Sequence, residues 1–199
     1  QDPDIVMVGE IRDQETARVA VQAALTGHLV LATLHTNDAP GAVARLLDMG
    51  IEPYLLAGVL NGVVAQRLAR TVCPQCVAKY VPSEGALADA GLLDKSGIAF
   101  RKGMGCEACH NSGFRGRAGI YSLMEVTARL RQMIHCAAPS HELRAVLHSQ
   151  GQLSLREEGV LLALTGKTPL EEVLSVTQGE EAEDPQTRVR DKAAARRGA

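Results

Sequence analysis

The spacing of apolar and polar positions predicts two strands and a helix in the first part of the chain. Residues 5–8 (IVMV) and 28–34 (HLVLATL) are short apolar runs rich in branched side chains, as expected of strands buried on both faces. Between them, Asp13 is a suitable helix N-cap, and Gly27 follows the last helical turn, where a left-handed backbone is common. Strand, helix and strand in this order predict a parallel α/β unit.

A second helix is predicted after the second strand. Asp38 is its expected N-cap, Pro40 lies in its first turn, and the helix ends just before Gly50. Residues 53–66 are rich in Leu, Val and Ala, and this pattern predicts a further helix. We assign residues 1–72 to a first, α/β domain.

The remaining chain changes character twice. Residues 73–119 hold four of the five cysteines and eight glycines, which predicts a small, loop-rich subdomain. Residues 120–177 have apolar positions at helical spacing and predict a C-terminal helical bundle. Its helices are expected to start at Thr127, Ser140, Ser154 and Thr168. Apolar residues almost vanish after that, so residues 178–199 are predicted to be a disordered tail.

Composition narrows the possible functions. With 46% hydrophobic and 22% charged residues among 199, most of the chain is expected to fold. The 21 basic residues do not outnumber the 23 acidic ones, and only 3% are aromatic, which argues against nucleic-acid binding. No apolar run reaches the roughly 18 residues of a membrane span, and the first residues do not resemble a signal peptide, so we expect a cytoplasmic protein without a transmembrane segment. The chain starts without Met, just before a strand, and we expect it to be a piece of a longer protein.

Two matched cysteine pairs predict a metal site. Cys73 and Cys76 enclose two residues, as do Cys106 and Cys109, with 29 residues between the pairs. Four thiolates complete a closed tetrahedral zinc site, and the long insert costs little because loop-closure entropy grows only slowly with length. We therefore predict a structural zinc ion held by these four cysteines.

Two other readings of the cysteines stay open at this point. One pair alone could be a thioredoxin-like redox motif, and the second pair with His110 spells C-x-x-C-H, the attachment motif of c-type haem. The remaining Cys136 is expected to be a buried helix residue.

Polar residues directly follow the two predicted strands. Glu10 comes after the first strand and His35 after the second, so both should stand at the carboxyl edge of a parallel sheet, where α/β proteins bind their ligands. A carboxylate there can orient a water molecule or support Mg²⁺, and a histidine can contact a terminal phosphate. From spacing alone, the alternative is a surface ion pair between Glu10 and Arg12, with His28 and His35 merely capping strands.

Several segments together resemble one known family. Residues 2–13 (DPDIVMVGEIRD) and 26–38 (TGHLVLATLHTND) look like the Walker B region and the His box of the secretion traffic ATPases. Residues 66–70 (QRLAR), the paired cysteines and residues 116–121 (GRAGIY) resemble the continuation of the same family. The match is closest to type II secretion ATPases of the GspE type, with type IV pilus assembly ATPases next, and it covers residues 1–176.

The resemblance implies the C-terminal part of a RecA-like P-loop NTPase domain. Proteins of this kind work as homohexamers on the cytoplasmic face of the inner membrane, where ATP-driven motions push on membrane platform proteins and assemble a pseudopilus. The complete protein would use ATP and Mg²⁺, and the zinc ion would be structural.

Roles carry over to individual residues by position. Glu10 matches the catalytic glutamate of Walker B, and His35 matches the His-box histidine near the phosphates. His28 matches the earlier histidine of that box, while Arg12 and Arg67 match positions that support the nucleotide site or a subunit interface.

The chain departs from the family pattern in two respects. It contains no G-x-x-x-x-G-K-[ST] phosphate-binding loop, and Gly9 stands where many P-loop NTPases carry a Mg²⁺-linked aspartate. Residues 166–168 (GKT) imitate the end of that loop, but position 161 is Leu and the segment follows a predicted helix. We expect the loop to lie upstream and this chain alone to be inactive. The competing hypotheses are a non-catalytic, zinc-bearing docking module and a zinc-dependent nucleic-acid binder.

Overall fold

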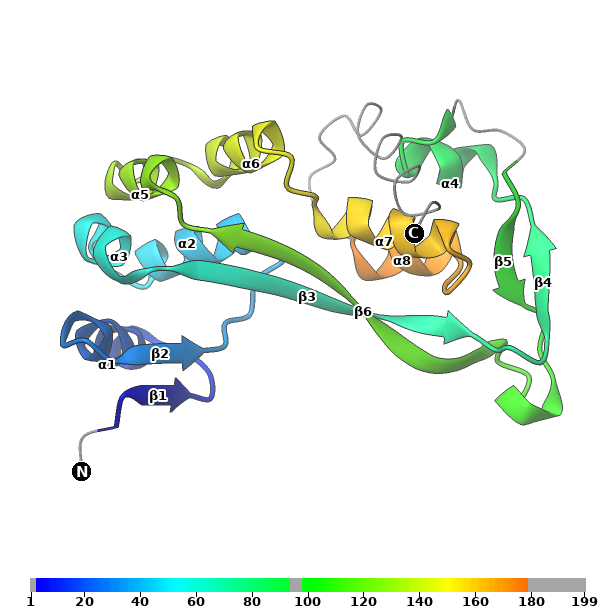
Figure 1. The fold of residues 1–199 in the computed structure, drawn as a ribbon, viewed down its shortest axis with the longest axis horizontal. Coiled ribbons are helices and arrows are strands. Elements are labelled where there is room, and N and C mark those ends of the chain that lie inside the picture. Colours follow the sequence, from blue (N-terminus) through cyan, green and yellow to red (C-terminus); the bar gives the residue numbers. More distant parts are fainter. Residues whose placement is uncertain (1–2, 94–97, 179–199) are drawn as a thin grey trace. The chain divides into compact units, whose positions relative to one another are not determined.

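The computed structural model describes residues 3–93 and 98–178, drawn in colour in Figure 1. The predicted disordered tail lies outside the described residues, apart from its first residue. The chain divides into two compact units. The first comprises the chain up to Ala65 together with Leu123–Gln152, and the second comprises Gln66–Ser122 together with the chain from Leu153. These units cut across the boundaries predicted at residues 72 and 119.

The first unit begins with the predicted strand–helix–strand motif. Strands β1 (Ile5–Val8) and β2 (Leu29–Ala32) are parallel, and helix α1 (Gln14–Leu25) connects them. Asp13 caps the helix as predicted, accepting a hydrogen bond from the Thr16 backbone N–H at 2.8 Å, and Gly27 has the expected positive φ of 100°. These local signals were sufficient because each is satisfied within one or two turns of chain.

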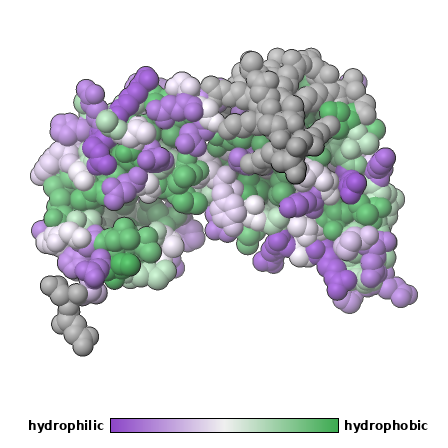
Figure 2. Space-filling view, in the orientation of Figure 1, coloured by the Kyte–Doolittle hydropathy of each residue, from purple (hydrophilic) through white to green (hydrophobic). Residues whose placement is uncertain are grey.

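One face of this two-stranded sheet is open, although both strands were predicted to be buried on both faces. Val8 and Val30 pack against the core, whereas four alternating side chains on the other face are exposed: Ile5, Met7, Leu29 and Leu31, at 59%, 77%, 49% and 51%. Figure 2 shows apolar surface over this part of the molecule. The prediction is wrong for the described residues because helices cover only one face of the sheet.

Four further helices complete the core of the first unit. They are α2 (Ala39–Asp48), α3 (Pro53–Val59), α5 (Ala128–His135) and α6 (Ser140–Ser149). Helix α3 packs against α1 and α5, and α2 packs against α6 (Figure 1). Asp38 caps α2 as predicted, through a 2.8 Å hydrogen bond from the Gly41 N–H. Two segments far apart in the sequence thus share one apolar core.

The helix predicted over residues 53–66 is wrong in its second half. Helix α3 ends at Val59, and the chain continues as the eleven-residue strand β3 (Gly62–Val72), which pairs with β6 (Phe114–Glu125). The burial of β3 alternates along most of its length, as a half-buried strand requires. Its partner strand lies some fifty residues away in sequence, so no local pattern could indicate that residues 62–66 form a strand. The helical pattern predicted from residue 120 likewise begins only after β6 ends.

The second unit combines a short hairpin with helices. Strand β4 (Val77–Tyr80) pairs antiparallel with β5 (Phe100–Gly103), and helix α4 (Glu84–Asp89) lies between them in sequence. Helices α7 (Leu155–Leu164) and α8 (Leu170–Val176) pack together and share a core with Phe100. The helices of the predicted C-terminal bundle are therefore divided, with α5 and α6 in the first unit and α7 and α8 in the second. Among the described residues, no helix has the length and apolar character of a membrane span.

Candidate functional site

Backbone pairing beyond the ends of β1 and β2 places the first candidate site. The Ile11 N–H donates to the Thr33 carbonyl at 2.9 Å, and the Thr33 hydroxyl donates to the Gly9 carbonyl at 2.5 Å. Ile11 is buried, and this burial fixes the segment that follows β1 and carries Glu10. The two strand ends therefore stay together, and Glu10 and His35 meet at the carboxyl edge of the sheet as the sequence predicted.

The Glu10 carboxylate contacts two side chains at once. Its Oε2 lies 2.5 Å from Arg12 Nη2, and its Oε1 lies 3.0 Å from His35 Nε2. The hydrogen bond from Arg12 lowers the pKa of Glu10 below its usual value, with partial burial opposing the shift and the charge of His35 adding to it. Glu10 is therefore ionised at neutral pH. An ionised carboxylate at this edge can hold a water molecule, accept a proton or face a divalent cation.

The Glu10–Arg12 ion pair is also what the alternative interpretation expected. Arg12 and His35 have side chains that are 78% and 90% exposed, so both can leave the carboxylate when a ligand arrives. The geometry brings Glu10, Arg12 and His35 together. The roles carried over to them from the family resemblance stay predictions.

The structure does not bring His28 to this cluster. His28 precedes β2, at the end of the strand opposite to Glu10, and its Nδ1 lies 3.0 Å from the Ala23 carbonyl oxygen and 3.1 Å from Thr26 Oγ1. Arg67 lies on β3 in the second unit, where its Nη1 donates to the Gln66 carbonyl at 3.2 Å. Support of a nucleotide site by these two residues stays a prediction.

Sequence reasoning missed Arg144, which contacts Asp38 in the loop after His35. Asp38 uses Oδ1 to cap α2, and its Oδ2 accepts a 2.6 Å hydrogen bond from Arg144 Nε on α6. Both side chains are largely buried, at 12% exposed for Asp38 and 23% for Arg144. The two residues are 106 positions apart, so no spacing pattern could have paired them.

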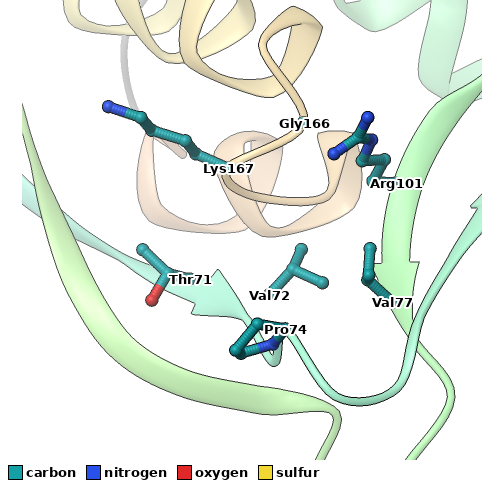
Figure 3. A pocket seen from close by; sticks show the side chains of 7 residues that line it. All are labelled: Thr71, Val72, Pro74, Val77, Arg101, Gly166 and Lys167. Atoms are coloured by element: carbon teal, nitrogen blue, oxygen red, sulfur yellow. The ribbon is translucent and has the colours of Figure 1, made fainter.

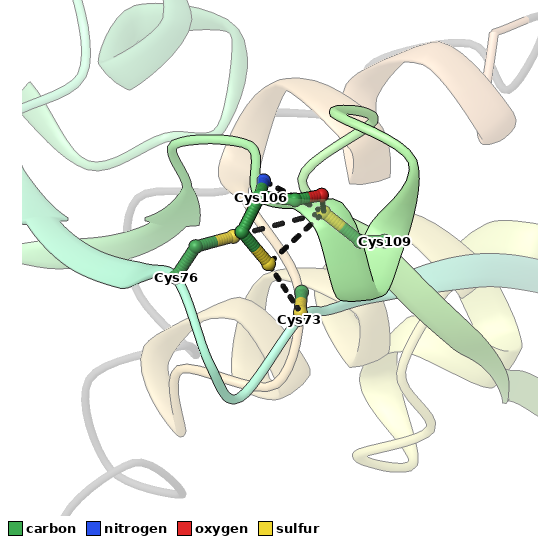
Figure 4. A group of neighbouring side chains, drawn as sticks. All are labelled: Cys73, Cys76, Cys106 and Cys109. Carbon is green, nitrogen blue, oxygen red and sulfur yellow. Dashed lines mark hydrogen bonds between the residues drawn. The ribbon is translucent and has the colours of Figure 1, made fainter.

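The four cysteines converge on one point, as the sequence predicted (Figure 4). Their Sγ atoms all lie within 4.8 Å of one another, and three of the separations are 3.9, 3.9 and 3.7 Å, for Cys73–Cys106, Cys76–Cys109 and Cys106–Cys109. Zn–S bonds of about 2.3 Å in a regular tetrahedron place sulfur atoms about 3.8 Å apart. The observed spacing therefore fits a tetrahedral thiolate site and exceeds the length of a disulfide bond.

Backbone N–H groups donate hydrogen bonds to two of the four sulfur atoms, those of Cys76 and Cys109. The N–H groups of Cys106 and Gly113 donate to Cys109 Sγ at 3.2 and 3.3 Å, and the Gly105 N–H donates to Cys76 Sγ at 3.3 Å. Burial opposes the shift of Cys109, but the Cys106 and Gly113 donors lower its pKa to about 6. Burial raises the pKa of Cys76 to about 11, and the Gly105 donor opposes this rise. A cation among four such sulfurs would favour all of them as thiolates.

The convergence of both pairs favours one metal site over two independent motifs. A redox pair or a haem attachment site would need only one of them. The fifth cysteine, Cys136, is exposed, and the expectation that it is a buried helix residue is wrong. It occupies the C-cap of α5, where the helix ends at the surface.

Residues 166–168 make structural hydrogen bonds within the second unit. They lie between α7 and α8, after a helix, as the sequence indicated. The Lys167 carbonyl accepts a 2.9 Å hydrogen bond from the Val72 N–H, and the buried Thr168 hydroxyl donates to the Arg70 carbonyl at 2.9 Å. This Gly-Lys-Thr segment therefore joins the α7–α8 connection to β3.

Curated relatives match the chain over most of its length. It is 49% identical over 180 residues to type II secretion system protein E of Pseudomonas aeruginosa, covering 90% of this chain and 36% of the relative. It is 50% identical over 181 residues to the type IV pilus assembly ATPase PilB of Myxococcus xanthus, covering 89% of this chain and 32% of the relative. The chain thus spans about a third of the length of these relatives.

Solved structures support the fold. A crystal structure of the pilus retraction motor PilT with bound ADP superposes with a TM-score of 0.60 at 22% identity, covering 90% of this chain and 41% of PilT. The Legionella pneumophila ATPase DotB matches with a TM-score of 0.58 at 18% identity, covering 89% and 39%. The family model described as type II/IV secretion system protein matches residues 1–175. The resemblance inferred from the sequence is confirmed, and the chain belongs to the type II/IV secretion system protein family.

Proposed function

We propose that this chain is part of an ATPase that powers type II protein secretion by driving assembly of a pseudopilus. The observation that carries the proposal is the pairing of an ionised Glu10 carboxylate with His35 Nε2, at 3.0 Å, on the carboxyl edge of two parallel strands. Relatives named type II secretion system protein E, with 49% and 48% identity, support the assignment to this system.

In this proposal Glu10 orients the attacking water and accepts its proton, as the corresponding carboxylate does in nucleotide hydrolysis. Arg12 keeps the carboxylate ionised, His35 contacts the terminal phosphate, and His28 and Arg67 support the site. ATP and Mg²⁺ supply the transferable phosphoryl group and its counter-charge when bound. The domain would be the C-terminal part of a RecA-like P-loop NTPase fold.

The proposed ATPase is longer than this chain. The sequence contains no phosphate-binding loop, and its match covers only 36% of the length of the Pseudomonas aeruginosa relative. The open face of β1 and β2 carries four large exposed apolar side chains. Both faces of a parallel sheet are normally covered by other elements of the protein. We therefore expect other parts of the protein to cover this face and supply the phosphate-binding loop, and this chain alone to be inactive.

We further propose that the cysteine cluster holds a structural zinc ion. Such a site contributes on the order of 10 kcal/mol to folding, which would offset the small core of the loop-rich segment. By its family, the complete protein would act as a homohexamer in the cytoplasm, docked on inner-membrane platform proteins.

Two alternatives have support of their own. Pilus assembly ATPases of Myxococcus xanthus and Thermus thermophilus are as similar as the secretion proteins, at 50% and 48% identity, which favours a type IV pilus motor as the second candidate. A non-catalytic, zinc-bearing docking module has the convergence of the four cysteines as its support. Disrupting the gene distinguishes the two systems, because loss of secreted protein indicates type II secretion and loss of surface pili indicates pilus assembly.

The catalytic proposal is tested in the protein extended upstream in its natural reading frame. Glu10→Gln should lower ATP turnover by at least about 100-fold while leaving nucleotide binding largely intact. The control is Glu52→Gln, an exposed glutamate of the same unit that makes no side-chain cap. Turnover by Glu10→Gln equal to that of the control would refute the role of Glu10. An upstream frame that lacks a phosphate-binding loop would instead favour the docking module.

A further inference from the structure

A pocket of about 250 Å³ in the second unit has no part in the proposed function. Its floor is formed by Val72, Pro74 and Val77, and two basic residues, Arg101 and Lys167, line it from other elements (Figure 3). Figure 3 shows these two side chains on either side of the backbone at Gly166. The pocket therefore combines an apolar floor with positive charge at its edge.

Arg101 is positioned by packing. A Cβ atom on Gly166 would lie 2.6 Å from Arg101 Cδ, so the arginine stem occupies the space that any larger residue would need. Gly166 also has a φ of 78°, which disfavours other residues at this turn. The close approach holds the arginine stem beside the pocket without the help of a carboxylate.

Neither basic residue has a counter-ion within the part of the chain that the structure describes. Arg12, Arg70 and Arg144 are all paired with carboxylates, but no ion pair among residues 3–93 and 98–178 involves Arg101 or Lys167. Arg101 and Lys167 are both exposed, so a ligand can reach their side chains. A held cation without a partner, beside an apolar floor, is suited to a carboxylate carried on an apolar group.

The adjoining hairpin continues the same pattern. Lys79 lies opposite Arg101 in the register of β4 and β5, so both share the face on which Val77 stands. Lys79 is exposed, and the next residue on this face beyond β4, Val81, is 64% exposed. Cationic and apolar side chains therefore alternate away from the pocket, as an extended segment with alternating acidic and apolar residues would require.

The pocket is less suited to phosphate. Phosphate sites rely on free backbone N–H groups, but the Val72 N–H donates to the Lys167 carbonyl at 2.9 Å. The Thr71 hydroxyl donates to the Arg115 carbonyl at 2.5 Å. With these donors in use, the apolar floor favours a side chain over an inorganic anion.

We propose that this pocket binds an acidic peptide segment of a partner protein, with an apolar side chain on Val72 and Val77, one carboxylate on Arg101 and a separate carboxylate on Lys167. The assignment is independent of ATP hydrolysis, because all of its residues lie in the second unit and none belongs to the Glu10 cluster.

The test uses the full chain, labelled with ¹⁵N and supplied with zinc, and the peptide acetyl-ELELE-amide as a probe. We expect saturable shifts of the Val72, Val77 and Gly166 amides. Arg101→Gln and Lys167→Gln should each weaken the peptide about two- to fivefold, the range of exposed ion pairs. The control is Lys102→Gln on the opposite face of the hairpin, where Lys102 Nζ lies 5.1 Å from the centre of the Tyr80 ring.

Several results would overturn the proposal. Equal binding of the neutral peptide acetyl-QLQLQ-amide would show that the charges do not matter, and equal binding of acetyl-ESESE-amide would show that the apolar floor does not. Inorganic phosphate that reproduces the same shifts at the same concentration would indicate an anion site. An equal loss of affinity in Lys102→Gln would indicate general attraction between charges. Unchanged amide spectra of the free variants confirm that each remains folded.

Discussion

Replacing Glu172 by Gln tests how the second unit is held together. The Glu172 side chain on α8 is only 6% exposed, yet it is charged, and Arg70 on β3 donates three hydrogen bonds to it. Its Oε1 accepts from the Arg70 backbone N–H at 3.0 Å and from Nε at 2.9 Å, while Oε2 accepts from Nη2 at 2.5 Å. The guanidinium also lies 4.1 Å from the centre of the Phe114 ring.

The expected loss follows from this geometry. Breaking a fully buried ion pair costs about 3 to 5 kcal/mol because it leaves an uncompensated charge. Here the Arg70 side chain is 56% exposed and water can solvate it, and the glutamine oxygen retains one acceptor, so we expect a smaller loss of about 2 to 3 kcal/mol.

The same pair predicts a pH dependence. The hydrogen bond from the Arg70 side chain lowers the pKa of Glu172 in the folded protein, with burial opposing the shift. A depressed folded pKa contributes stability that is present above the unfolded pKa, about 4.3, and is lost as the pH falls through the folded value. The difference between wild type and Glu172→Gln should therefore be constant near neutral pH and shrink below about pH 4.

Hydrogen exchange at amides of the second unit measures this loss directly, because it reports each unit separately where a single unfolding curve would not. The matched control is Glu171→Gln in the same first turn of α8, which removes the same charge from the helix N-terminus. Glu171 accepts one hydrogen bond, from the Tyr80 hydroxyl, which a glutamine oxygen can still accept. Equal protection in the two variants would refute the claim that the Arg70 pair stabilises the unit.

Three further perturbations test other parts of the structure. Cys109→Ser should abolish stoichiometric zinc binding and amide protection around the cluster, whereas Cys136→Ser should bind zinc like wild type; zinc analysis and hydrogen exchange check both. A double-mutant cycle with Asp38→Asn and Arg144→Gln should give a coupling energy of about 1 to 2 kcal/mol in the first unit, and additive effects would contradict the buried contact. Gly159→Ala should destabilise the second unit by about 1 kcal/mol, because its Cβ would lie 2.5 Å from a Val173 methyl group and overpacking outweighs the gain in helix propensity; higher stability in hydrogen exchange would contradict this.

Sequence reasoning succeeded where the determining interactions are local. The caps at Asp13 and Asp38 and the left-handed exit at Gly27 each involve residues within four positions of one another. It failed where partners are distant. Residues 62–66 have side chains that both a helix and a strand accept, and only the pairing of β3 with β6 decides between the two.

The candidate sites divide in the same way. Cysteine spacing alone predicted which four thiols would converge, because two short C-x-x-C turns leave few other arrangements of four ligands. The positions of Glu10 and His35 followed from the rule that parallel strands end at one edge.

The sequence by itself determined the strand–helix–strand order, the helix caps, the set of four converging cysteines and the meeting of Glu10 with His35. Only the tertiary structure decided three contacts: the ion pair of Arg144 with Asp38, the ion pair of Arg70 with Glu172, and the packing of the Arg101 stem against Gly166. These contacts join residues between 65 and 106 positions apart, and each depends on side chains that fold onto one another through space. Packing of that kind leaves no periodic signal along the chain, because it is set by the shape of the assembled core and not by neighbours in sequence.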